Sequence, residues 1–243
     1  MTKVIPSLLT VGNLVIGVVA LLLSYRGFTA NAALLVVIGM ALDGLDGRAA
    51  RYFHAESEFG KELDSLSDIV TFGVAPAFIM YNVILQYQGW VGIAIAVLFP
   101  VTGALRLARF NVQKTSTRYF VGLPITAAGG ILATLALYRN LLSPAEVILP
   151  IGMIILSVLM VSKVRYPNFK KVAFPRSAVV VVPLLALFVY VVFRYQHASV
   201  HRLIFIPLAL YAVYGMWRGI RRRAAAAQRE REEAAEVYKS SLK

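Results

Sequence analysis

The segment DGLDGRAARYFHAESEFGKELDSLSD, residues 43–68, joins two long apolar runs at residues 28–53 and 66–87. It holds every aspartate of the chain: Asp43, Asp46, Asp64 and Asp68. Each run is long enough to cross a bilayer, which takes roughly 20 apolar residues. An ionised carboxylate near the centre of a membrane helix costs roughly 2.5 kcal/mol or more, so acids kept in or beside the hydrocarbon usually serve a function. The segment therefore predicts two antiparallel membrane helices with a polar site at one end.

The composition extends this interpretation to the whole chain. Of the 243 residues, 59% are hydrophobic and 15% are charged, and there is no cysteine for a disulfide or a thiolate metal site. Soluble domains contain roughly 45–50% apolar and about 25% charged residues. Apolar runs of spanning length lie at 7–25, 28–53, 66–87, 89–111, 120–139, 145–162, 175–193 and 200–218. We therefore expect an all-α, polytopic bundle of about eight transmembrane helices over residues 1–220, with a charged helical tail at 221–243.

The basic residues predict the orientation of this bundle. The formal net charge is +13, and the 25 lysines and arginines lie mostly on one side of the expected membrane. The exceptions are Arg26, Arg139, Arg194 and Arg202. By the positive-inside rule, both termini and the loop that carries the acids face the cytoplasm, which predicts a multi-pass protein of the cell membrane. Topology and attraction to anionic membrane lipid account for the basic excess, so nucleic acid is not an expected partner.

The spacing of the aspartates predicts a metal site. Asp43 and Asp46 are three residues apart, and Asp64 and Asp68 are four apart, so each pair shares one helix face. Both pairs should lie at the same membrane depth, because the two helices are antiparallel neighbours. Four facing carboxylates repel one another unless divalent cations lie between them. Oxygen-only ligands favour Mg²⁺ or Mn²⁺, and two such ions suit phosphoryl transfer.

Small residues and a cation accompany the acids. Gly47 and Ala50 leave space beside them, Arg51 adds a permanent positive charge, and Gly60 suits a tight loop before the next helix. This combination fits a pyrophosphate ligand. Two alternatives remain open. The acids could form an ordinary charge cluster with neighbouring cations, or they could line the ion path of a cation transporter, which would place them near the bilayer midplane on broken helices.

The full pattern is Asp43-x-x-Asp46-Gly47-x-x-Ala50-Arg51, then eight residues, then Gly60-x-x-x-Asp64-x-x-x-Asp68. It resembles the signature of the CDP-alcohol phosphatidyltransferase family. Segments at 5–13, 104–111 and 120–124 are similar to the phosphatidylserine synthase branch of that family, so the resemblance covers roughly residues 5–130. Thr126 departs from it, because the branch is expected to carry a second proline at this position after Gly122-Leu123-Pro124.

The resemblance implies an enzyme in which an alcohol hydroxyl attacks the lipid-linked phosphorus of CDP-diacylglycerol and CMP leaves. It also implies a homodimer. By position, it makes metal ligands of Asp43, Asp46, Asp64 and Asp68, the last of which is also the general base. The residues implied in binding CDP-diacylglycerol are Thr10, Asn13, Gly47, Ala50, Arg51 and Gly60.

The acceptor is inferred from charge. L-Serine, the acceptor that the branch implies, carries a carboxylate that needs a cation near the metals. Arg106 and Arg109, three residues apart at the end of the fourth apolar run, are the candidates, with Asn111 beside them. Alternatively, the two arginines only anchor the helix at the membrane surface. Glycerol 3-phosphate, the acceptor of a phosphatidylglycerophosphate synthase, would also use a basic pocket, and ether-linked lipid chains are as compatible as ester-linked ones.

Overall fold

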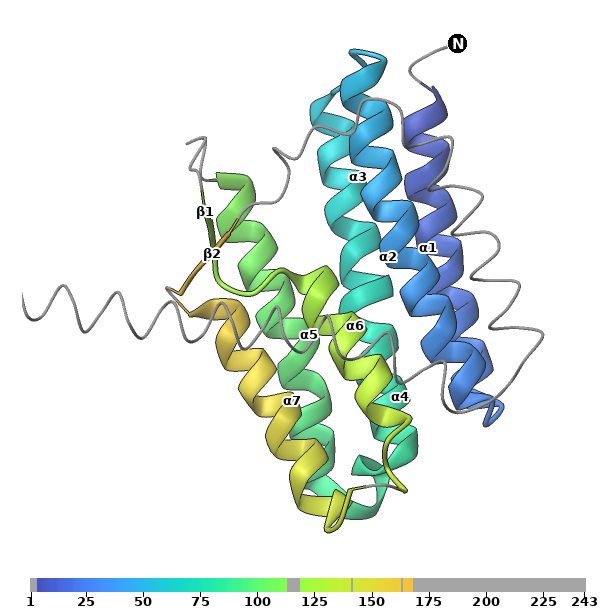
Figure 1. Cartoon of the computed structure of the whole chain (residues 1–243), viewed down its shortest axis with the longest axis vertical. Helices are drawn as coiled ribbons and strands as arrows, with labels where there is room; N and C mark the ends of the chain where they lie inside the picture. Colours follow the sequence, from blue (N-terminus) through green and yellow to red (C-terminus); the bar gives the residue numbers. More distant parts are fainter. Residues whose placement is uncertain (1–3, 113–118, 141, 163, 168–243) are drawn as a thin grey trace, which may run out of the picture.

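The described part of the chain is a bundle of helices (Figure 1). The structure is a computed structural model that describes residues 4–112, 119–140, 142–162 and 164–167. In chain order these residues form α1 (Val4–Tyr25), α2 (Thr29–Tyr52), α3 (Glu58–Asp68), the π-helical η1 (Ile69–Val74), α4 (Ala75–Val83), the 3-10 helix η2 (Leu85–Gln88), α5 (Gly89–Val112), α6 (Ile125–Ala136) and α7 (Ala145–Val161). Two three-residue strands, β1 (Tyr119–Val121) and β2 (Arg165–Pro167), pair antiparallel beside the bundle. The predicted all-α class is confirmed for these residues.

Within the described residues, four helical stretches are long and apolar enough to cross a membrane. They are Pro6–Tyr25, Thr29–Tyr52, Glu58–Val83 and Leu85–Val112, and they correspond to the first four predicted crossings. The fifth and sixth predictions fall on α6 and α7, which are apolar helices of 12 and 17 residues. The predicted helices at 175–193 and 200–218 and the tail at 221–243 lie outside the described residues, so the number of eight stays a prediction.

The third membrane helix begins earlier than its predicted start at residue 66. Ser57 caps it, because the Ser57 Oγ accepts a hydrogen bond from the backbone N–H of Gly60 at 3.0 Å. Glu58 adds a negative charge to the first turn, where it interacts favourably with the helix dipole. The helix then continues through α3, η1 and α4. Asp64 and Asp68 therefore lie inside the helix rather than at its beginning.

The predicted crossing at 120–139 is too long. β1 is followed by Gly122 at φ +83°, and Pro124 is the N-cap of α6. A Cβ at Gly122 would run into the carbonyl oxygen of Met160, so only glycine fits this turn. At about 1.5 Å per residue, the 12 residues of α6 span roughly 18 Å, short of the roughly 30 Å hydrocarbon core. α6 accordingly begins part-way down the bundle (Figure 1).

Glycines allow the first helices to pack closely. α1 packs along α2, and both contact η1. A Cβ at Gly17 would lie 2.8 Å from the Cα of Thr71, and a Cβ at Gly39 would lie 2.7 Å from the Thr71 Cγ2. The Thr71 hydroxyl donates to the backbone carbonyl of Asn13 at 2.9 Å. Small residues at such interfaces are typical of membrane helices, which gain little hydrophobic free energy by associating in lipid.

Chain reversals bring four helix ends together. α1 and α2 are joined by a tight turn at Gly27, φ +83°, at one end of the bundle, and α2 and α3 are joined by residues 53–57 at the other. α4 and α5 are joined through η2 at the first end. The start of α1, the end of α2, the start of α3 and the end of α5 therefore share one end of the bundle (Figure 1).

Candidate active site

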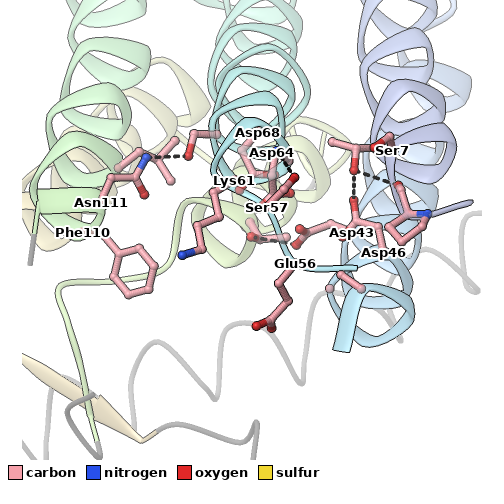
Figure 2. Close-up of a pocket in the computed structure, with 18 of the residues that line it drawn as sticks. Ser7, Asp43, Asp46, Glu56, Ser57, Lys61, Asp64, Asp68, Phe110 and Asn111 are labelled. Carbon is pink, nitrogen blue, oxygen red and sulfur yellow. Dashed lines mark hydrogen bonds between the residues drawn. The ribbon is translucent and has the colours of Figure 1, made fainter. Parts of the chain in front are cut away.

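A cavity of about 440 Å³ opens at this shared end, walled by α1, α2, α3, α5 and the start of α6. Of the residues predicted for the site, its lining includes the four aspartates and Thr10, Gly47, Ala50, Arg51, Gly60, Arg106 and Asn111. Figure 2 shows the acids of α2 and α3 facing one another across this space. Asn13 and Arg109 are absent from the lining.

Three of the four carboxylates form one group. Asp43 of α2 and Asp64 and Asp68 of α3 each offer an oxygen, and these oxygens lie within 4.8 Å of one another. Asp68 is 7% exposed, and its Oδ1 is buried with no hydrogen-bond partner among the described residues. The other aspartates repel its charge, and Arg106 attracts it. So many acids at one buried point need an opposing charge.

This donor set fits a hard divalent cation. The group of Asp43, Asp64 and Asp68 offers carboxylate oxygens alone, and the chain has no cysteine. Mg²⁺ and Mn²⁺ prefer such ligands, and the buried Oδ1 of Asp68 has lone pairs that nothing else in the described structure uses. The metal predicted from the spacing of the aspartates therefore agrees with the chemistry of the residues present.

Threonines from two other helices hold the aspartates of α2. Asp46 is 4% exposed and lies outside the group of three, and its Oδ2 accepts a hydrogen bond from the Thr10 hydroxyl of α1 at 2.9 Å. The Oδ2 of Asp43 accepts one from the Thr126 hydroxyl of α6 at 3.3 Å. Thr126 was not predicted for the site. Its only signal was the departure from the family pattern, which gave no indication of its partner.

The wall formed by α5 is basic and polar. Arg106 is 6% exposed, and its guanidinium carbon lies 5.9 Å from the centroid of the Phe110 ring. Asn111 donates from Nδ2 to the Ser65 Oγ at 3.0 Å, which joins α5 to α3 (Figure 2). Lys61 of α3 also lines this part of the cavity. Phe110 was not predicted, although its position four residues after Arg106 places it on the same helix face.

Arg109 and Asn13 have other places in the structure. Arg109 donates from Nη1 to the carbonyl of Val161 at 3.1 Å, and from Nη2 to those of Val121 at 3.2 Å and Ser162 at 3.4 Å. It thereby ties α5 to β1 and to the end of α7. Asn13 is fully buried, one helical turn below Thr10.

Comparisons with known proteins agree with this geometry. Residues 3–164 match the model of the family described as CDP-alcohol phosphatidyltransferase, a range that includes the whole cavity lining. The chain is 42% identical over 168 residues to a CDP-diacylglycerol–serine O-phosphatidyltransferase of Bacillus subtilis, covering 69% of this chain and 92% of the relative. It is 38% identical over 221 residues to the enzyme of that name from Helicobacter pylori, covering 88% and 90%. It is 36% identical over 171 residues to an archaetidylserine synthase of Methanothermobacter thermautotrophicus, covering 68% and 70%.

Proposed function

This chain belongs to the CDP-alcohol phosphatidyltransferase family, and we propose that it is an enzyme that transfers the phosphatidyl group of CDP-diacylglycerol to the hydroxyl of L-serine, releasing CMP. The observation that carries the proposal is the carboxylate group of Asp43, Asp64 and Asp68 at a cavity that the buried Arg106 also lines. The names of the relatives support serine as acceptor, since the bacterial and archaeal proteins share it while their names imply different lipids.

The α2–α3 side of the cavity is assigned to the metals and to the nucleotide. The proposed ligands of two Mg²⁺ or Mn²⁺ ions are Asp43, Asp46, Asp64 and Asp68. When bound, such ions supply positive charge beside the phosphate oxygens. Gly47, Ala50 and Gly60 line the cavity without long side chains, which leaves room for the cytidine diphosphate. Arg51 contributes a permanent charge for the pyrophosphate, and Thr10 closes the cavity from α1.

Asp68 is the proposed general base. Its carboxylate belongs to the group of three and lines the cavity, so one of its oxygens can accept the proton of the serine hydroxyl. The hydroxyl oxygen forms a bond to the phosphorus that carries the diacylglycerol, and the bond from that phosphorus to the CMP oxygen breaks. The proton passes to Asp68, and CMP leaves with the electron pair.

Arg106 is the proposed partner of the serine carboxylate. It lines the cavity, and its burial keeps its charge effective because little water is present to screen it. Asn111 lies five residues further along α5, also in the cavity lining, and can contribute an amide to the acceptor. Arg109, with its guanidinium on three backbone carbonyls, is assigned to the framework.

The test is CMP release by the purified full chain in detergent with CDP-diacylglycerol and Mn²⁺. L-Serine, glycerol 3-phosphate and inositol are supplied separately, with the lipid product identified by mass spectrometry. We expect serine-dependent release that is lost in Asp68→Asn and kept in Glu62→Gln, a matched change at an exposed carboxylate of α3 outside the cavity lining. CMP release that depends on another acceptor would overturn the serine assignment. CMP release that is the same with and without an acceptor would overturn the transfer reaction. A parallel assay with the ether-linked CDP-archaeol identifies the preferred lipid chain.

We also propose that the site faces the cytoplasm of the cell membrane and that the chain is a homodimer. The end of the bundle that holds the site carries Arg48, Arg51 and Lys61, whereas Arg26 and Arg139 lie away from that end. The chain has no cysteine, so single cysteines can report sidedness. In intact cells, an impermeant maleimide should label Arg26→Cys and spare Glu58→Cys, and the reverse pattern would invert the topology.

For the homodimer, light scattering in detergent should give twice the chain mass of 26.7 kDa.

A further inference from the structure

Thr126 occupies an unusual place at the edge of the metal group. It is the second residue of α6, lines the cavity, and is half-buried. Its hydroxyl donates to the Oδ2 of Asp43 at 3.3 Å, across 83 residues of sequence. Thr134, the other α6 residue whose hydroxyl hydrogen bonds the structure describes, differs from Thr126. Its hydroxyl bonds the carbonyls of Gly130 and Ile131 within its own helix. The Thr126 hydroxyl is therefore directed at the site and not at its own helix.

The two aspartates of α2 differ in what surrounds them. Asp46 is held by Thr10 and stands apart from the group of three carboxylates. Asp43 belongs to that group, so it experiences the repulsion of Asp64 and Asp68 at close range. Repulsion favours side-chain rotation away from the group. A hydrogen bond from α6, which packs against α2, restrains that rotation at the Oδ2 of Asp43.

We propose that Thr126 is a positioning residue of the metal site, whose hydroxyl holds the Asp43 carboxylate in the orientation that completes the group with Asp64 and Asp68. Carboxylates that bind metals are commonly fixed by such hydrogen bonds, and removing the outer partner typically lowers metal affinity by roughly 10- to 100-fold. The inference rests on the proposed function, because it requires the metal site to exist. It does not depend on which acceptor the enzyme uses.

The test is a Mn²⁺ titration of the purified full chain, without substrate, in which electron paramagnetic resonance measures free Mn²⁺. Thr126→Val replaces the hydroxyl by a methyl group of similar size, and Thr126→Ser keeps the hydroxyl. We expect the apparent Kd for Mn²⁺ to rise about 10- to 100-fold in Thr126→Val and to stay near the wild-type value in Thr126→Ser. Thr134→Val, the same change two turns further along α6, should leave the Kd unaltered. Thr126→Ala serves in place of the valine variant if the latter does not yield folded protein.

Two further readouts separate positioning from a general structural effect. Thr126→Val should raise the Mn²⁺ concentration needed for half-maximal CMP release while kcat at saturating Mn²⁺ recovers. In an Asp43→Asn background, Thr126→Val should have no further effect on the Kd. Wild-type affinity in Thr126→Val, or an equal loss in Thr134→Val, would overturn the inference. If the wild-type chain itself bound no Mn²⁺, the proposed metal site would fail, which is a distinct outcome from an unchanged variant.

Discussion

Replacing Arg106 by glutamine should make the enzyme lose its preference for an acceptor that carries a carboxylate. Arg106 is 6% exposed at the cavity wall, so water does little to screen its charge. Hydrogen bonds to charged groups contribute about 1.5–3 kcal/mol. Because about 1.4 kcal/mol corresponds to a factor of ten, kcat/KM for L-serine should fall by roughly 10- to 100-fold. L-Serinamide has the same hydroxyl and ammonium groups with an uncharged amide, and its kcat/KM should change little.

The assay is CMP release with each acceptor, and the measured quantity is the ratio of kcat/KM for L-serine to that for L-serinamide. The ratio cancels effects on folding, on the nucleotide lipid and on Asp68, which Arg106 also attracts. Arg109→Gln is the matched control three residues away, and it should keep the wild-type ratio because its guanidinium contacts backbone carbonyls. An equal fall in kcat/KM for both acceptors in Arg106→Gln would refute carboxylate recognition by Arg106. A lower ratio in Arg109→Gln would assign that recognition to Arg109.

Three other predictions test the framework and the metals. Gly129→Ala would place a Cβ 2.8 Å from the Phe72 Cα, a backbone atom that cannot move aside, so it should cost about 1–3 kcal/mol and lower the Tm in detergent. In Gly152→Ala the new Cβ makes only an ordinary contact, with Leu135 Cδ1 at 3.8 Å, so the Tm should not fall. Equal Tm values for the two variants would contradict the described packing. Ser57→Ala removes the N-cap of α3 and should cost about 1 kcal/mol, whereas Ser57→Asp should keep the Tm, and a stable alanine variant would argue against the cap. Chelation by EDTA should stop CMP release and lower the Tm, because a metal ion that binds the folded state stabilises it. Added Mn²⁺ or Mg²⁺ should restore both the activity and the Tm. CMP release that persists in EDTA would exclude metal dependence.

The grouping of Asp43, Asp64 and Asp68 could be predicted because its determinants are local, whereas Asp46, expected in the same group, lies outside it. Helical spacing places Asp64 and Asp68 on one face, and the short connection between α2 and α3 brings Asp43 to the same depth. The first four crossings follow from the length of apolar runs for the same reason. The start of α3 was missed because apolar periodicity carries no information there, and the cap at Ser57 determines the helix start instead.

The remaining features depend on contacts between residues far apart in the chain. The spacing of Arg106 and Arg109 suggested a shared role, but one side chain lines the cavity and the other binds carbonyls 12 to 53 residues away. Thr10 and Thr126 likewise reach Asp46 and Asp43 over separations of 36 and 83 residues. No periodic pattern within one helix encodes such pairs, because they follow from how helices pack and where the chain turns.

The shortness of α6 connects these distant contacts to the chemistry. A helix that began at residue 120 would carry Thr126 past its first turn, where its hydroxyl would compete for a carbonyl of its own helix, as Thr134 does. The turn at Gly122, whose N–H donates to the carbonyl of Val164 at 2.8 Å, delays the helix start and places Thr126 beside Asp43 instead. Arg109 donates a hydrogen bond to the carbonyl of Val121 on the same turn, so it supports the carboxylate group indirectly. Arg109→Gln should therefore raise the Mn²⁺ concentration needed for half-maximal CMP release without altering the choice of acceptor. This result would separate the roles of the two arginines.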